Sequence, residues 1–199
     1  MIAWINFAVL IFATLFFLYF YFLSVSPAAL ENVIGPVAYH RCGRFRVVAI
    51  IFEFVTLVNY VLYRFYPLPV PLPNAFPWPW WVSTLIALVI GVPSIALMVI
   101  GMKDAGEEAV IPKKEHTMYG GIYNRIRHPQ AAGEVFGWLW IAFLLHSPFL
   151  AAFSLIYFPV FLIMCCIFSK SRGDFRSLDW IYACCNVLPR LRKSSTAND

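Results

Sequence analysis

Apolar and polar residues are arranged along this chain in long blocks. The first block, from Ile2 to about Val25, contains no charged residue, and about 20 such residues suffice for a helix to cross a hydrocarbon layer about 30 Å thick. Further apolar blocks cover about 47–65, 81–102, 131–146 and 149–168. The pattern predicts an all-α, polytopic membrane helical bundle of about five transmembrane helices.

The breaks between these blocks predict how the spans connect. Gly35 and Pro36 precede a polar connection that carries His40, Arg41, Arg44 and Arg46. Six prolines between Pro67 and Pro79 predict an extended, non-helical turn. The short break His146-Ser147-Pro148 predicts that the last two spans form a helical hairpin.

Composition supports a lipid environment. Hydrophobic residues make up 61% of the chain, and the mean hydropathy is +0.74, which is more apolar surface than one soluble core of this size can bury. We therefore expect a single membrane domain over 1–199.

The charges predict an orientation. With five spans, fourteen of the fifteen basic residues fall on one side of the membrane and only Arg64 falls on the other. By the positive-inside rule, the N-terminus is outside, and the loop 103–130 and the tail 169–199 are cytoplasmic. A net charge of +5 spread over juxtamembrane segments favours contact with anionic membrane lipid over nucleic acid.

Cysteine and histidine spacing predicts neither a disulfide framework nor a metal site. Four of the five Cys form two pairs of adjacent residues, Cys165-Cys166 and Cys184-Cys185, and no C-x-x-C or His-x-x-x-His spacing occurs.

One carboxylate interrupts the second apolar block. Glu53 lies in the middle of the expected span, where a charge is costly and normally faces the bundle interior or a watery cavity. It is a candidate functional residue, and a Glu that serves packing alone has the same sequence signature.

A polar segment bracketed by glycines, Gly120 to Glu134, joins the third and fourth blocks. Gly120-Gly121 permits a tight turn, and Pro129 suits the first turn of the following helix. A helix N-terminus offers free N–H groups, to which Arg127 and His128 add donors for a carboxylate or phosphate. The segment predicts an anion or polar-cofactor site at the membrane surface. Arg125 and Arg127 bound only to lipid phosphates would leave the same composition.

The motif Gly121-x-Tyr123-x-x-x-Arg127-His128-Pro129-x-x-x-Gly133, preceded by Lys114-Glu115-His116, resembles the core of the isoprenylcysteine carboxyl methyltransferase family, whose superfamily includes phospholipid and small-thiol methyltransferases. The resemblance implies an integral membrane enzyme that uses S-adenosylmethionine and a lipidic or small hydrophobic acceptor.

The same resemblance implies roles for individual residues. The cofactor pocket would be lined by His116, Tyr123, Arg127, His128, Pro129 and Gly133. The catalytic candidates would be Arg127, which can hold a carboxylate of the cofactor or acceptor, and Glu134, one residue past Gly133.

The tail differs from the family pattern. A pair of adjacent Glu normally follows the last span, whereas this chain reads Ser169-Lys170-Ser171-Arg172-Gly173-Asp174. Glu134 and Glu53 are the candidate substitutes for that pair. The alternative is a non-catalytic membrane protein that retains the fold for cofactor or lipid binding or for partner assembly. A transporter is a third possibility, suggested only by the two intramembrane carboxylates.

Overall fold

The computed structural model describes residues 1–112, 121–126, 129–161 and 163, and these residues form helices and turns without a strand. The longer helices are α1 (Ile2–Ser24), α3 (Val37–Phe65), α4 (Trp80–Ala105) and α5 (Pro129–Leu144). The shorter elements are α2 (Pro27–Ile34), α6 (Pro148–Ser154) and two 3₁₀ turns, η1 (Gly106–Ala109) and η2 (Gly121–Asn124). The prediction of an all-α chain is confirmed over these residues.

Three helices are long and apolar enough to cross a membrane: α1, α3 and α4 together with η1. Their outward faces are apolar, as Val89 with 75% and Phe54 with 65% of their surface exposed illustrate. Such faces are stable in lipid and costly in water. The chain is therefore an integral membrane protein by these criteria. Five spans remain a prediction, because α5 has only 16 residues.

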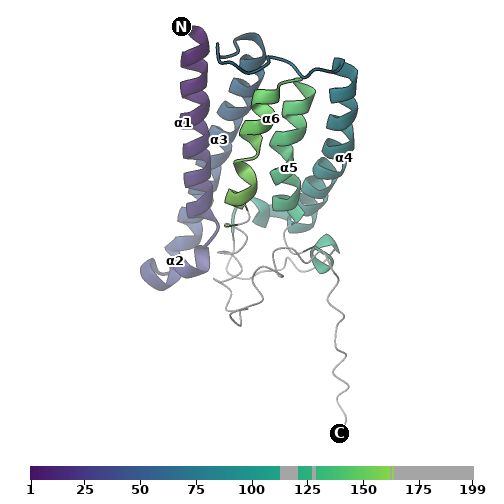
Figure 1. The fold of residues 1–199 in the computed structure, drawn as a ribbon. Helices are drawn as coiled ribbons and strands as arrows, with labels where there is room; N and C mark the ends of the chain where they lie inside the picture. The colour runs from purple at the N-terminus through teal and green to yellow at the C-terminus, as the bar shows by residue number, and fades with distance from the viewer. Residues whose placement is uncertain (113–120, 127–128, 162, 164–199) are drawn as a thin grey trace.

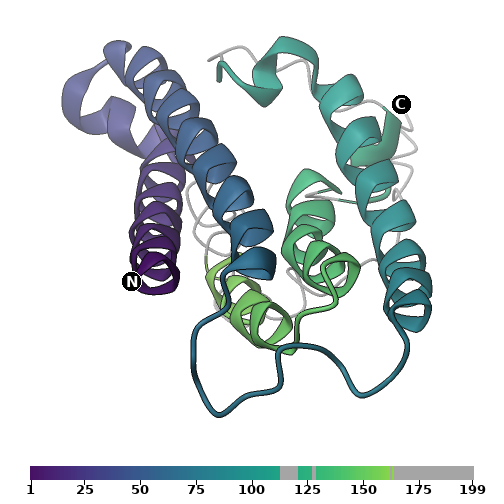
Figure 2. The ribbon, with the colours of Figure 1, turned by 90° about the horizontal axis from the view of Figure 1, so that it is seen from above.

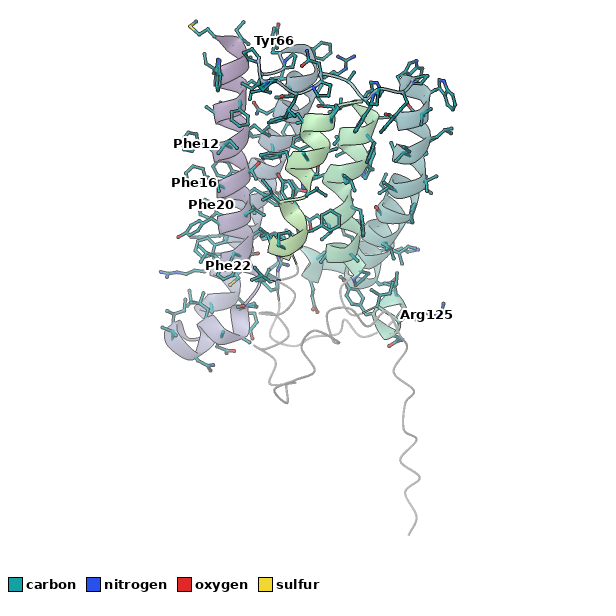
Figure 3. The ribbon with its side chains drawn as sticks, viewed as in Figure 1. Phe12, Phe16, Phe20, Phe22, Tyr66 and Arg125 are labelled. Carbon is teal, nitrogen blue, oxygen red and sulfur yellow. The ribbon has the colours of Figure 1, made fainter. Side chains whose placement is uncertain are left out.

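The helices form a bundle in which α5 and α6 lie between two outer groups (Figures 1 and 2). On one side α1 packs along α3, and on the other α4 packs along α5. The N-terminus and Tyr66 lie at one end of the bundle, and α2 and Arg125 lie at the opposite end (Figures 1 and 3). Which end faces the cytoplasm stays a prediction.

Aromatic rings fill the centre of the bundle. Trp138 of α5 stacks on Tyr157, with ring centroids 5.2 Å apart, and also contacts Tyr60 of α3 at 4.9 Å. Phe17 of α1 reaches the same cluster, 6.4 Å from Trp138. Rings from four segments far apart in sequence thus bring α1, α3, α5 and the residues after α6 together.

Hydroxyl groups in this core form hydrogen bonds. Thr14 and Tyr157 share a hydrogen bond of 3.2 Å between their hydroxyls, and Ser154 donates to the Trp138 carbonyl at 3.0 Å. Lipid offers no hydrogen-bond partner, so buried hydroxyls of a membrane bundle must find each other or the backbone.

The expected connection between the first two spans is mostly helical, so the helix ends predicted on either side of it were wrong. The residues His40, Arg41, Arg44 and Arg46 belong to α3, which begins at Val37, and α2 occupies part of the expected connection. An apolar block marks the part of a helix that lies in lipid, and a helix continues into water wherever its polar residues are also helix formers. Gly35, with φ of 73°, supplies the reversal between α2 and α3.

The last expected span, 149–168, is interrupted in the part that the structure describes. Helix α6 ends at Ser154, and a turn at Leu155 and Ile156 precedes further helix over 157–161. The first arm of the hairpin begins at Pro129, two residues before the expected 131. A three-residue connection joins α5 to α6, as the His146-Ser147-Pro148 break indicates.

Candidate functional site

The start of the glycine-bracketed motif is fixed to the end of α4. The Asp104 carboxylate accepts a hydrogen bond of 2.7 Å from the Ile122 backbone N–H. Gly121 has φ of 58°, and a side chain at this position would overlap Asp104. Glycine is therefore required here both by the backbone conformation and by the close approach of Asp104.

Tyr123 reinforces the same attachment. Its hydroxyl donates to the Gly101 carbonyl at 3.1 Å. The pKa of Tyr123 is raised from its ordinary value, chiefly by burial and further by the negative charge of Asp104, while the positive charge of Arg46 opposes the rise. The phenol thus stays a neutral donor, and η2 is held to α4 by two hydrogen bonds.

The first turn of α5 lies against α4 at Gly101. A Cβ added to Gly101 would lie 3.0 Å from side-chain atoms of both Pro129 and Gln130. Gln130 is held with its Nε2 buried, and this amide has no hydrogen-bond partner among the described residues. A buried amide donor without a partner at a helix N-terminus suits a polar ligand.

Gly133 brings the two helix backbones into contact. A Cβ at this position would lie 2.5 Å from the Ser94 carbonyl oxygen and 3.0 Å from the Met98 nitrogen. Both are backbone atoms, which cannot move aside without displacing α4. Helices in lipid commonly associate through such small residues, so Gly133 has a packing role whether or not it contacts a cofactor.

A groove of about 260 Å³ lies beyond Gly133, between α3, α4 and α5. Its lining is mostly apolar, and its polar side chains are Glu53 of α3, Ser94 of α4 and Glu134 of α5. Three exposed residues in the lining, Phe54 at 65%, Ile50 at 46% and Ile95 at 42%, place its mouth on the outward face of the bundle, where lipid lies.

The two carboxylates of the groove influence each other. Glu134 experiences the charge of Glu53 and accepts a hydrogen bond of 3.5 Å from the Tyr21 hydroxyl. Glu53 has no hydrogen-bond partner among the described residues. Two acidic groups at this depth would each be costly as ions without a counter-charge.

The positive charge of Arg46 acts on Glu134, but its described hydrogen bonds go to backbone carbonyls. Its Nη1 donates to the carbonyls of Glu108 and Ala109 at 3.3 and 2.9 Å, and its Nη2 donates to the Ser24 carbonyl at 3.4 Å. Arg46 thus ties α3 to the ends of α1 and η1. No Lys or Arg is among the groove residues that the structure describes.

The structure brings together some of the predicted site residues. Glu53, Gly133 and Glu134 share the groove, whereas Tyr123 and Pro129 lie at the contact of η2 and α5 with α4. His116, Arg127 and His128 lie outside the described residues. Their roles in cofactor binding stay predictions.

Three residues of this region were missed by the sequence argument: Asp104, Gln130 and Tyr21. Asp104 and Tyr21 act on partners 18 and 113 residues away in sequence, so no local pattern reveals them. Gln130 had a detectable signal, since it is a polar residue in the first turn of an apolar helix, directly after Pro129.

No family model, curated protein or solved structure matches this chain.

Proposed function

We propose that this chain is an integral membrane methyltransferase that uses S-adenosylmethionine and methylates a lipidic or small hydrophobic acceptor. The observation that carries the proposal is that α5 begins in the polar motif and then forms a wall of the lipid-facing groove. Pro129 and Glu134 are five residues apart, or about 7.5 Å along a helix. Direct transfer between a polar donor and an apolar acceptor needs such a short separation.

The first turn of α5 fits the polar part of this cofactor. Its free N–H groups and the unpartnered Nε2 of Gln130 are donors suited to a carboxylate. Arg127, His128 and His116 are the further ligands that the resemblance implies. Tyr123 would contribute its ring, because its hydroxyl is bonded to Gly101.

The groove suits the acceptor. When bound, the cofactor supplies a methyl group on a sulfonium. The apolar walls, including Leu57 and Met98, would exclude water and orient the acceptor. Glu53 and Glu134 meet in this groove from separate helices, which supports their role as the substitute for the family's paired Glu. Either carboxylate could accept a proton that the acceptor must release.

A non-catalytic protein that binds cofactor or lipid is the second candidate. It is favoured by the fact that Gly121, Tyr123 and Gly133 each have a packing role within this chain. A fold that had lost its chemistry would keep these residues for stability alone.

Binding of radiolabelled S-adenosylmethionine to the purified full-length protein tests the proposal. We expect saturable binding that is weakened by His128→Ala and by Gln130→Met, which keeps the side-chain volume and removes the amide. Asn124→Ala, which removes an exposed amide from the same segment, is the matched control and should bind as the wild type does. Absence of saturable binding by the wild type would contradict the enzyme. Binding without transfer to a panel of lipids, amines and thiols would favour the second candidate.

A further inference from the structure

Because the groove between α3, α4 and α5 is apolar but carries two acidic groups, we infer that its occupant is a lipophilic amine: an apolar chain ending in an ammonium group, with no phosphate or carboxylate beside it. The inference goes further than the proposed function by naming the acceptor class. It rests on the proposed function only for the methylation of the amine, since binding of the amine requires no cofactor.

Charge complementarity selects the ammonium. Glu53 has no hydrogen-bond partner among the described residues, and Glu134 has the single weak donor Tyr21 at 3.5 Å. Arg46 acts on Glu134 through its charge, while its guanidinium donates to three backbone carbonyls. An ammonium group between Glu53 and Glu134 would bring a positive charge and several N–H donors into direct contact with both carboxylates.

The same charges disfavour other head groups. A carboxylate or a phosphate in this position would face two acidic side chains with no Lys or Arg in the described lining to offset them. An anionic head group would thus add a third acidic group to a low-dielectric groove without a counter-charge, which is costly. The groove therefore discriminates against an isoprenylcysteine carboxylate, and against a phospholipid whose phosphate lies next to its amine.

The walls of the groove suit the rest of the molecule. Trp138 and Trp140 of α5 both line it with large apolar rings. Gly137, which also lines the groove, has nothing within 4 Å of an added Cβ. The space in front of Gly137 is thus free for an apolar chain, and the mouth at Phe54 and Ile95 leads that chain into lipid.

Glu134 lies close to the polar motif at the start of α5. Glu134 lies about 7.5 Å along α5 from Pro129, so an amine anchored there would keep its chain in the hydrocarbon layer. For methyl transfer the bound ammonium first gives a proton to Glu53 or Glu134. The nitrogen lone pair then forms the new bond to the methyl carbon, and the carbon–sulfur electron pair stays on sulfur.

Equilibrium binding of radiolabelled dodecylamine tests the inference, with the full-length protein in lipid nanodiscs and empty nanodiscs subtracted. No S-adenosylmethionine is present. We expect saturable binding that unlabelled dodecylamine displaces, and at least about tenfold weaker competition by dodecanol, dodecanoic acid and phosphatidylethanolamine. Glu53→Gln and Glu134→Gln should each weaken dodecylamine binding about tenfold or more.

Matched variants distinguish loss of the dodecylamine site from loss of the folded structure. Glu31→Gln changes an acidic residue of α2, outside the groove, and should bind dodecylamine as the wild type does. Gly137→Leu adds a side chain to the groove at a position where an added Cβ has no atom within 4 Å, and it should abolish binding while the thermal unfolding midpoint is kept.

Equal competition by the alcohol, the acid or the phospholipid would overturn the inference, as would unchanged binding by the folded Gln variants. Failure of dodecylamine to bind a protein that still binds S-adenosylmethionine would overturn the amine and leave the methyltransferase standing. The converse result would retain the amine site and contradict the methyltransferase.

Discussion

Two helix contacts in this bundle differ in the size of the residues that form them. Between α1 and α3, Phe20 and Phe52 stack with their rings 6.0 Å apart, and Asn6 bonds the Asn59 carbonyl at 3.3 Å. Between α4 and α5, backbone approaches backbone at Gly133 with no side chain interposed. Because lipid removes most of the hydrophobic force between helices, both contacts depend on packing and hydrogen bonds. Large side chains fill the contact between α1 and α3, whereas the contact between α4 and α5 requires that no side chain stand between the helices.

The contrast explains the position of the groove. Helix α5 is held close to α4 by glycines and is separated from α3 by wide aromatic side chains such as Trp138. The groove lies beside α5, between α3 and α4, and both Gly133 and Trp138 line it. Substitutions in the two contacts should therefore destabilise the protein to different extents.

The largest effect is expected from Trp138→Ala in the aromatic contact. Trp138 is 97% buried, with an exposed fraction of 3%, and touches Tyr60, Tyr157 and Phe17. Its loss should cost about 3–5 kcal/mol of unfolding free energy, because the surrounding rings belong to several helices and cannot collapse together. Unfolding of the protein in mixed detergent measures this loss of unfolding free energy. Trp4→Ala, at a residue 56% exposed to lipid, is the control and should change stability by less than about 0.5 kcal/mol.

The next effect is expected from adding one methyl group to the glycine contact. Gly133→Ala should destabilise the protein by about 1–3 kcal/mol, because the methyl meets backbone atoms of α4. Gly137→Ala on the same helix has open space around it and should stabilise the protein by about 0.5–1 kcal/mol through helix propensity. The same unfolding assay compares the two. Equal effects at both positions would refute the backbone contact.

These two contacts also mark the limit of what the sequence could predict. Apolar blocks predicted helices at each of the five ranges, and Pro129 correctly marked the start of α5. The chain gave no sign that Gly133 faces Ser94 or that Glu53 meets Glu134. Those pairings come from segments about 40 and 80 residues apart in sequence, and they follow from tertiary packing, which leaves no local periodicity.

A smaller and local effect is expected where the motif meets α4. Asp104→Asn should weaken the hydrogen bond to the Ile122 N–H by about 1 kcal/mol, because a charged acceptor is replaced by a neutral one. Hydrogen exchange at the Ile122 amide should then accelerate about fivefold. Exchange in the centre of α1 should not change, and a uniform acceleration across the bundle would show that the effect is not local.

The smallest effect concerns pH and the Tyr123 hydroxyl. Burial raises its pKa in the folded protein, so the neutral phenol is favoured by folding. The stabilisation is fully present below the pKa of the unfolded state, about 10, and is lost as pH rises through the raised pKa of the folded state. Ultraviolet titration of tyrosinate, compared with Tyr123→Phe, should reveal one late-titrating group. A difference spectrum with an unshifted midpoint would contradict the bonded phenol.

The lateral mouth of the groove at Phe54 and Ile95 determines how occupancy should be expressed. A molecule that enters from the bilayer is concentrated there before it meets the protein, and it searches in two dimensions. Its occupancy then follows its mole fraction among the lipids, while its aqueous concentration matters only through partitioning. Doubling the amount of lipid at constant total ligand should halve the mole fraction and lower the occupancy, although the protein and its affinity are unchanged.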